Sequence, residues 1–152
     1  MVFKLERRSV VAGAVAAAAM VGGFGGRAMA APTTHYDEAL AAVLDGREAA
    51  VGEIAIEAPE VAENGNMVPV TIAVESPMTA ADHVRRITLL STRNPVALVA
   101  RYHLTPMNGR ALVSSRIRLS ETQDIVAVAE LADGSLRRAS RLVRVTVGGC
   151  GA

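Results

Sequence analysis

The chain contains one cysteine and no tryptophan in 152 residues, and aromatic residues make up only 3% of it. One cysteine cannot form a disulfide within the chain, so the fold must be stable without such a bond. The single thiol of Cys150 must therefore pair with another molecule, lie buried and inert, or take part in chemistry.

Lysine and phenylalanine occur only in residues 1–30, and beyond them Tyr36 and Tyr102 are the only aromatic residues. Without residues 1–30 the chain loses four of its 16 cationic and one of its 15 acidic residues, which leaves a net charge of −2. Nucleic-acid binding uses clustered cations and aromatic stacking platforms. We therefore expect no nucleic-acid partner.

The first thirty residues, MVFKLERRSVVAGAVAAAAMVGGFGGRAMA, have the pattern of an export signal. A basic start, a weakly apolar run over 10–24 and the A-x-A site at 28–30 follow in the usual order. The pair Arg7-Arg8 favours the twin-arginine route, which carries folded proteins. The apolar run is too short for a membrane span, and Arg27 interrupts it. We expect cleavage after residue 30 and a periplasmic protein that is not membrane-bound.

Residues 35–45 have the apolar spacing of a helix, with Thr34 as a candidate cap and Gly46 as a candidate end. Its predicted apolar face comprises Tyr36, Leu40, Val43 and Leu44.

From there the apolar period changes to two, which is typical of strands. Strands are predicted over 52–57, 67–75, 85–91, 97–104, 111–119, 124–131 and 136–147. Asn64-Gly65, Asn108-Gly109 and Asp133-Gly134 are the best hairpin signals between them. About seven closely spaced strands after one short helix indicate a mainly β protein, an antiparallel β-sandwich over residues 31–147.

The sequence closes on VTVGGCGA, in which Gly148, Gly149 and Gly151 flank Cys150. Glycine favours no single conformation, so we expect the last strand to end at Val147 and residues 148–152 to form a flexible arm. Three residues past Val147 extend at most about 10 Å.

A nucleophilic cysteine needs a lowered pKa from a histidine, a cation or a helix N-terminus, and none is near Cys150 in sequence. A thiol on a thin tether without its own activation suits a covalent carrier, whose partner's active site supplies the geometry. Lipid attachment is disfavoured, because prenylation needs a cysteine fourth from the end.

Other candidate residues have simpler explanations. The three histidines, His35, His83 and His103, lack metal-ligand spacing, so we expect no metal site. The run Arg137, Arg138, Arg141 and Arg144 fits the polar face of the last strand, although it could also guide acidic partners or hold an anionic adduct.

Four stretches bring the chain close to a known family: the twin-arginine leader, PEVAENGNMVPVTIAVESPMTAADHV (59–84), HLTPMNGRALVSSRIRL (103–119) and the terminal VTVGGCGA. The chain resembles the SoxY family, the sulfur carriers of the bacterial thiosulfate-oxidising Sox system. The family ending is GGCGG, so Ala152 is a mild departure.

The resemblance implies an immunoglobulin-like sandwich that forms a heterodimer with SoxZ and is exported with it. Cys150 would take up thiosulfate through a c-type cytochrome. A hydrolase would then release sulfate, and a sulfane dehydrogenase would oxidise the remaining sulfur. Gly148, Gly149 and Gly151 would form the carrier arm. The protein would hold no cofactor and would be a substrate carrier rather than an enzyme.

Two other functions stay open. An exported interaction module would use Cys150 for a disulfide with another chain, and a self-sufficient thiol enzyme would turn over substrate alone. Neither the face that binds the partner subunit nor the presence of a sulfane dehydrogenase follows from the sequence.

Overall fold

The structure is a computed structural model that describes residues 35–149. In this part of the chain the elements are α1 (Tyr36–Leu44), β1 (Ala49–Val51), β2 (Ile54–Glu57), β3 (Val61–Ala62), β4 (Val68–Val74), β5 (Val84–Ser91), β6 (Leu98–His103), the 3-10 turn η1 (Pro106–Asn108), β7 (Ala111–Ile117), β8 (Gln123–Leu131) and β9 (Leu136–Val145). The predicted helix and all seven predicted strands are confirmed, as is the mainly β sandwich. The predicted signal over residues 1–30 lies outside the described residues.

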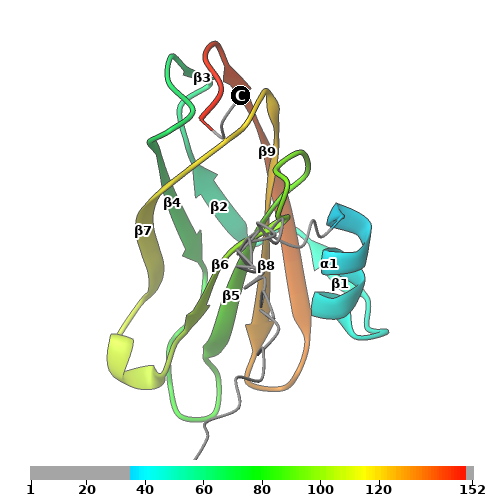
Figure 1. Ribbon diagram of the computed structural model, residues 1–152. Coiled ribbons are helices and arrows are strands. Elements are labelled where there is room, and N and C mark those ends of the chain that lie inside the picture. The colour runs from blue at the N-terminus through cyan, green and yellow to red at the C-terminus, as the bar shows by residue number, and fades with distance from the viewer. Residues whose placement is uncertain (1–34, 150–152) are drawn as a thin grey trace, which may run out of the picture. The chain divides into compact units, whose positions relative to one another are not determined.

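The strands form two sheets that face each other (Figure 1). The larger sheet has the order β1-β9-β8-β5-β6, with β3 also paired to β9, and the smaller sheet has the order β2-β4-β7. The predicted strands pair antiparallel throughout, as strands joined by short connections do.

Two short strands, β1 and β3, were not predicted, and both pair with β9 in parallel. The segment 49–62 therefore joins the edge of the larger sheet, crosses to the smaller sheet as β2, and returns. The crossing from β1 to β2 occurs at Gly52 and Glu53, which both have positive φ angles (114° and 60°). The predicted antiparallel pairing is therefore correct among the seven predicted strands, and the pairings of β1 and β3 with β9 are the exceptions.

Of the three hairpin signals, only Asp133-Gly134 connects paired neighbours, β8 and β9. The prediction is wrong for Asn108-Gly109, which connects β6 and β7 of different sheets. The predicted strands on either side of Asn64-Gly65, β2 and β4, do pair antiparallel, but the unpredicted β3 lies between them, so this turn directly connects β3 to β4 of the other sheet. An Asn-Gly pair marks a tight change of direction, but strand pairing depends on which apolar faces meet.

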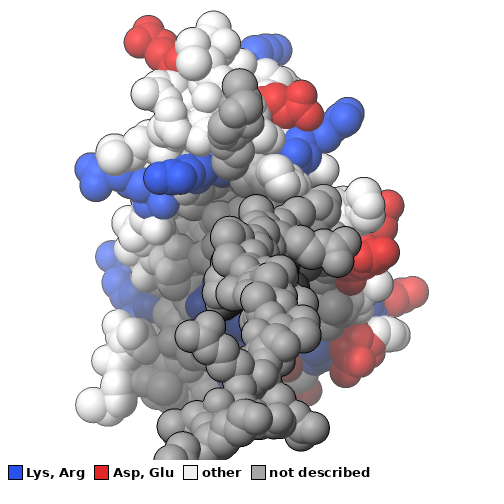
Figure 2. All heavy atoms as spheres, viewed as in Figure 1, with Lys and Arg blue, Asp and Glu red and all other residues white. Residues whose placement is uncertain are grey.

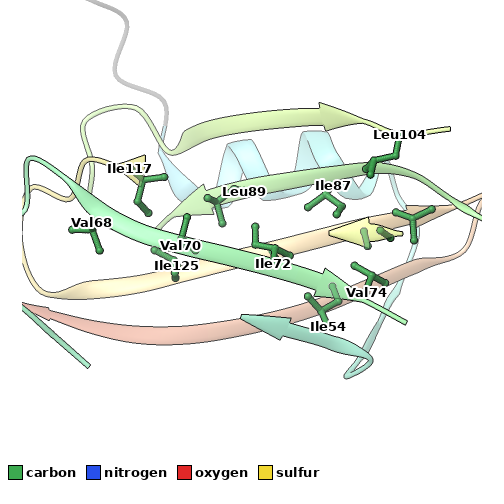
Figure 3. Packing of buried hydrophobic residues seen from close by; sticks show 14 of the residues in the cluster. Ile54, Val68, Val70, Ile72, Val74, Ile87, Leu89, Leu104, Ile117 and Ile125 are labelled. Atoms are coloured by element: carbon green, nitrogen blue, oxygen red, sulfur yellow. The ribbon is translucent and has the colours of Figure 1, made fainter. Parts of the chain in front are cut away.

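The main core lies between the two sheets. Alternate residues of β4, from Val68 to Val74, point inward and are buried, and they meet Ile87 and Leu89 of β5 and Ile125 of β8 (Figure 3). Burying one such side chain stabilises the fold by about 1.5–3 kcal/mol, so the alternation seen in the sequence supplies much of the stability of the sandwich.

A second apolar cluster lies on the other face of the larger sheet, under α1 (Figure 1). Ala39 and Val43 of the helix are buried there against Leu90, Val126 and Val128. The predicted apolar face of the helix is confirmed, since its other members pack at the margin of this cluster. Among the described residues no helix is long and apolar enough to cross a membrane.

Candidate functional site

The candidate site is the end of the sandwich at which the chain leaves β9 (Figure 1). Beyond Val145 the chain stays bonded to the end of β3 and to the loop between β3 and β4. The Thr146 amide donates to the Ala62 carbonyl at 3.0 Å, and the Gly65 amide donates to the Val147 carbonyl at 2.7 Å.

A third segment, the connection between β7 and β8, completes this arrangement. The Gly149 amide donates to the Leu119 carbonyl at 2.9 Å, and the Leu119 amide donates to the Gly65 carbonyl at 2.8 Å. Gly65, Leu119, Val147 and Gly149 thus join three segments by backbone hydrogen bonds alone. We call these four residues the glycine clasp.

The clasp leaves no space for side chains at its glycines. A Cβ on Gly65 would lie 2.2 Å from the Leu119 carbonyl oxygen, and one on Gly149 would lie 2.2 Å from the Gly65 carbonyl carbon. A Cβ on Gly148 would lie 2.1 Å from the Ser120 carbonyl oxygen. Glycine is required here for close approach of backbones rather than for an unusual φ angle.

These contacts differ from the expectation that the chain is free from residue 148 onward. Gly149 is buried and its amide is hydrogen-bonded, so the chain is still anchored four residues past the end of β9. Cys150 and Gly151 lie outside the described residues. Their assignment, with Gly148 and Gly149, to a carrier arm stays a prediction.

The β7–β8 connection is itself held by Asn94, in the loop between β5 and β6. The Asn94 side-chain amide donates to the Arg118 carbonyl at 2.8 Å. Its oxygen accepts from the Ser120 amide at 3.0 Å and from the Gln123 side chain at 2.8 Å. Because Leu119 lies between the two bonded residues and is fully buried, the clasp rests on a rigid support.

The histidines are not brought together as a metal site, and residues 35–149 contain no group of three His, Cys, Asp or Glu side chains that could hold a metal ion. His83 lies in the loop before β5, where Nδ1 is 3.0 Å from the Thr79 carbonyl. This contact lies within one exposed turn.

The arginine run on β9 is spread along the strand rather than gathered near the clasp. Arg137 pairs with Glu53 at the beginning of the strand, and Arg144 pairs with Glu60 near its end. These pairs favour the interpretation of the run as the polar face of the strand.

Charge concentrates at the opposite end of the sandwich, around Glu130. Burial by itself would raise the pKa of this carboxyl. The hydrogen bond from Arg47 and the positive charges of Arg86, Arg47 and Arg85 outweigh burial and hold the pKa below its ordinary value. Arg47 Nη1 lies 3.1 Å from Glu130 Oε1, and Arg86 bonds the other oxygen. This cluster ties the loop after α1 to β5 and β8.

A hollow of about 460 Å³ also lies at that opposite end, where the end of β4 meets the beginnings of β2 and β7. Its lining includes Glu53, Ala73, Arg110 and Leu112. It contains no cysteine or histidine and lies far from the clasp along the strands. We assign no chemistry to it.

The sequence did not point to Gly65, because an Asn-Gly pair between two strands predicted only a turn. Its partners lie more than fifty residues away, and no local pattern indicates such contacts. The only signal at this position is the glycine itself, which permits the close approach of another backbone.

Comparison with known proteins identifies the fold. The family described as "Sulfur oxidation protein SoxY" matches residues 40–150. The sulfur carrier protein SoxY from Chlorobium limicola f thiosulfatophilum is 34% identical, with a TM-score of 0.58, and the match covers 73% of this chain and 96% of that one. No curated protein is matched by the sequence.

A second group of similar structures shares the fold alone. A superoxide reductase (neelaredoxin) from Ignicoccus hospitalis is 24% identical at a TM-score of 0.55, over 62% of this chain and 80% of that one. A putative superoxide reductase from Thermotoga maritima is 23% identical at a TM-score of 0.53, over 64% and 87%. The family match spans most of the chain and ends on Cys150, so the chain belongs to the SoxY family of sulfur oxidation proteins.

Proposed function

We propose that this protein is a covalent carrier of sulfur intermediates, which it holds on Cys150 during the oxidation of thiosulfate to sulfate. The observation that carries the proposal is the family match, which runs through the whole β-sandwich and ends on the only cysteine of the sequence. The similarity to a sulfur carrier over 96% of that protein's length supports it.

The chemistry follows from the thiol. Loading would join the Cys150 sulfur to the outer sulfur of thiosulfate, with loss of the thiol proton and transfer of two electrons to a c-type cytochrome. Water would then cleave the sulfonate group as sulfate and a proton, which leaves a persulfide on Cys150. A sulfane dehydrogenase would oxidise the persulfide sulfur to a sulfonate, taking up three waters, releasing protons and passing six electrons to its own acceptor. A second hydrolysis would release sulfate and restore the Cys150 thiol. The carrier needs no cofactor for these steps, since partner enzymes supply the electron acceptors and the water activation.

We further propose a periplasmic heterodimer with SoxZ, exported through the twin-arginine route. The leader with Arg7-Arg8 supports the route, and the family supports the partner. A folded pair can pass through this route together, so one leader would serve both subunits.

The test is loading of Cys150, measured by intact-protein mass spectrometry after incubation with thiosulfate and the purified cytochrome. We expect an adduct on the unaltered protein and none on Cys150→Ser, with unchanged circular dichroism. Loading of the serine variant would refute the proposal. A stable disulfide-linked species without any sulfur adduct would instead support the interaction module.

A further inference from the structure

The glycine clasp limits how far the thiol of Cys150 can reach. Gly149 is buried and bonded to Leu119, and consecutive Cα atoms are about 3.8 Å apart. With two side-chain bonds added, the thiol stays within about 7 Å of the Gly149 Cα. An enzyme that receives the thiol must therefore press against the surface immediately around the clasp.

That surface carries three exposed apolar side chains. Val61, Met67 and Val147 are 50%, 66% and 63% exposed, and each lies on a segment bonded into the clasp or within two residues of it. We call these three residues the apolar rim. Exposed valine and methionine side chains on segments that are bonded to one another are typical of protein interaction sites.

Charged residues surround the rim rather than interrupt it. Glu60, Glu63, Glu121, Arg118 and Arg144 are exposed on the same loops and strand ends. Figure 2 shows mostly uncharged atoms at this end of the molecule, with acidic and basic side chains at the margins. An apolar centre within a charged margin is the usual composition of a transient interface.

We infer that the apolar rim is the docking surface for the enzyme that loads Cys150. This inference rests on the proposed carrier function. The occupant is an enzyme with a narrow thiol-accepting pocket bordered by apolar side chains, because the tether is short and its surroundings are apolar.

A matched pair of methionines tests the inference. Met67 lies on the rim, and Met107 lies in η1 at the opposite end of the sandwich with 94% exposure. Both are exposed, so Met67→Glu and Met107→Glu should fold equally well. Loading by the purified thiosulfate-conjugating cytochrome is followed by intact-protein mass spectrometry, with the SoxZ complex used where the two subunits copurify.

We expect Met67→Glu to lower kcat/KM for loading about tenfold, since an interface side chain near a reactive centre commonly contributes that much. Met107→Glu should stay within about twofold of the unaltered protein. Val147→Glu, with Val51→Glu as its control on the exposed strand β1, should repeat the contrast. Alkylation of Cys150 by iodoacetamide should proceed at the same rate in the unaltered protein and in all four variants, because none of the substitutions alters the thiol itself.

Equal loading by the rim variants and their controls would overturn the inference while the carrier function stands. Loss of SoxZ copurification in the rim variants alone would also overturn it, because the rim would then belong to the subunit interface. If the unaltered protein is not loaded at all, the carrier function and this inference fail together.

Discussion

The two ends of the sandwich are organised differently. At the end with the clasp, four segments bond to one another: the β3–β4 loop, the β5–β6 loop, the β7–β8 connection and residues 146–149. At the opposite end most turns close on themselves, as Thr79 does with Asp82 and Thr105 with Asn108. Links between loops there are fewer: the Ala132 amide donates to the His83 carbonyl at 2.8 Å, and the Arg47 side chain bonds Glu130 and the Gly134 carbonyl.

This difference fits the proposed carrier function. Turns that bond within themselves only reverse the chain, and they can vary without disturbing their neighbours. Loops that bond to one another fix the position of Gly149, the residue before Cys150. When Gly149 is fixed, a sulfur group attached to Cys150 could take fewer positions. A smaller number of positions lowers the entropy cost of entering one pocket of a partner enzyme.

The largest expected effect is that of Gly65→Ala at the clasp. The new Cβ would lie 2.2 Å from the Leu119 carbonyl oxygen, so two backbone segments must separate. We expect a loss of about 2–3 kcal/mol in the free energy of unfolding, as for other overpacked sites, measured by urea denaturation. Hydrogen exchange at the Gly149 amide should become faster.

Gly109→Ala is the matched control at the opposite end. Gly109 has a φ of 68° and open space around its Cα, so the change costs only backbone strain, about 1–2 kcal/mol. Exchange at Gly149 should then stay slow. If both variants speed exchange at Gly149 equally, the clasp does not depend on close packing at Gly65.

A smaller effect is expected for Asn94→Ala, which removes the support of the β7–β8 connection. Gln123, only 3% exposed, would lose the nearest acceptor of its side-chain amide and keep the Glu121 carbonyl at 3.2 Å, while the Ser120 amide would lose its acceptor. Buried groups left without partners cost about 1–3 kcal/mol. Thermal or urea unfolding measures the loss.

Asn108→Ala at the other end provides the comparison. Asn108 bonds only Thr105 within its own exposed turn, so its loss should cost about 0.5–1 kcal/mol. Equal destabilisation by the two variants would contradict the distinction between bonded and self-contained loops.

Sequence patterns predicted the strands well and the clasp not at all, for a physical reason. Alternating burial, as along Val68–Val74, is a local property and can be read from consecutive residues. Strands β1 and β3 have three and two residues, too few to show a period, and they form because the edge of β9 is available. Contacts among Gly65, Leu119 and Gly149 are non-local, and a glycine gives no sign of which backbone it approaches.

The smallest expected effect concerns pH at the end opposite the clasp. The pKa of Glu130 is lowered in the folded state, where bonds and charge from Arg47 and Arg86 outweigh the cost of burial. A lowered folded-state pKa stabilises the fold fully above the ordinary value of 4.5, and the contribution disappears as pH falls through the lower value. Glu130→Gln should therefore cost about 0.5–1 kcal/mol at pH 7 and flatten the loss of stability below pH 4.5.

Glu60→Gln separates the two ends in the same titration. Glu60 pairs with Arg144 near the clasp, but its side chain is 80% exposed, so solvent and salt screen the pair. The urea midpoint at pH 7 should stay close to that of the unaltered protein for Glu60→Gln and fall for Glu130→Gln, and only the Glu130→Gln difference is expected to disappear at low pH. If Glu60→Gln lowers the midpoint at pH 7 and Glu130→Gln does not, charge stabilises the clasp end rather than the end that carries Arg47, and the clasp would no longer rest on backbone bonds alone.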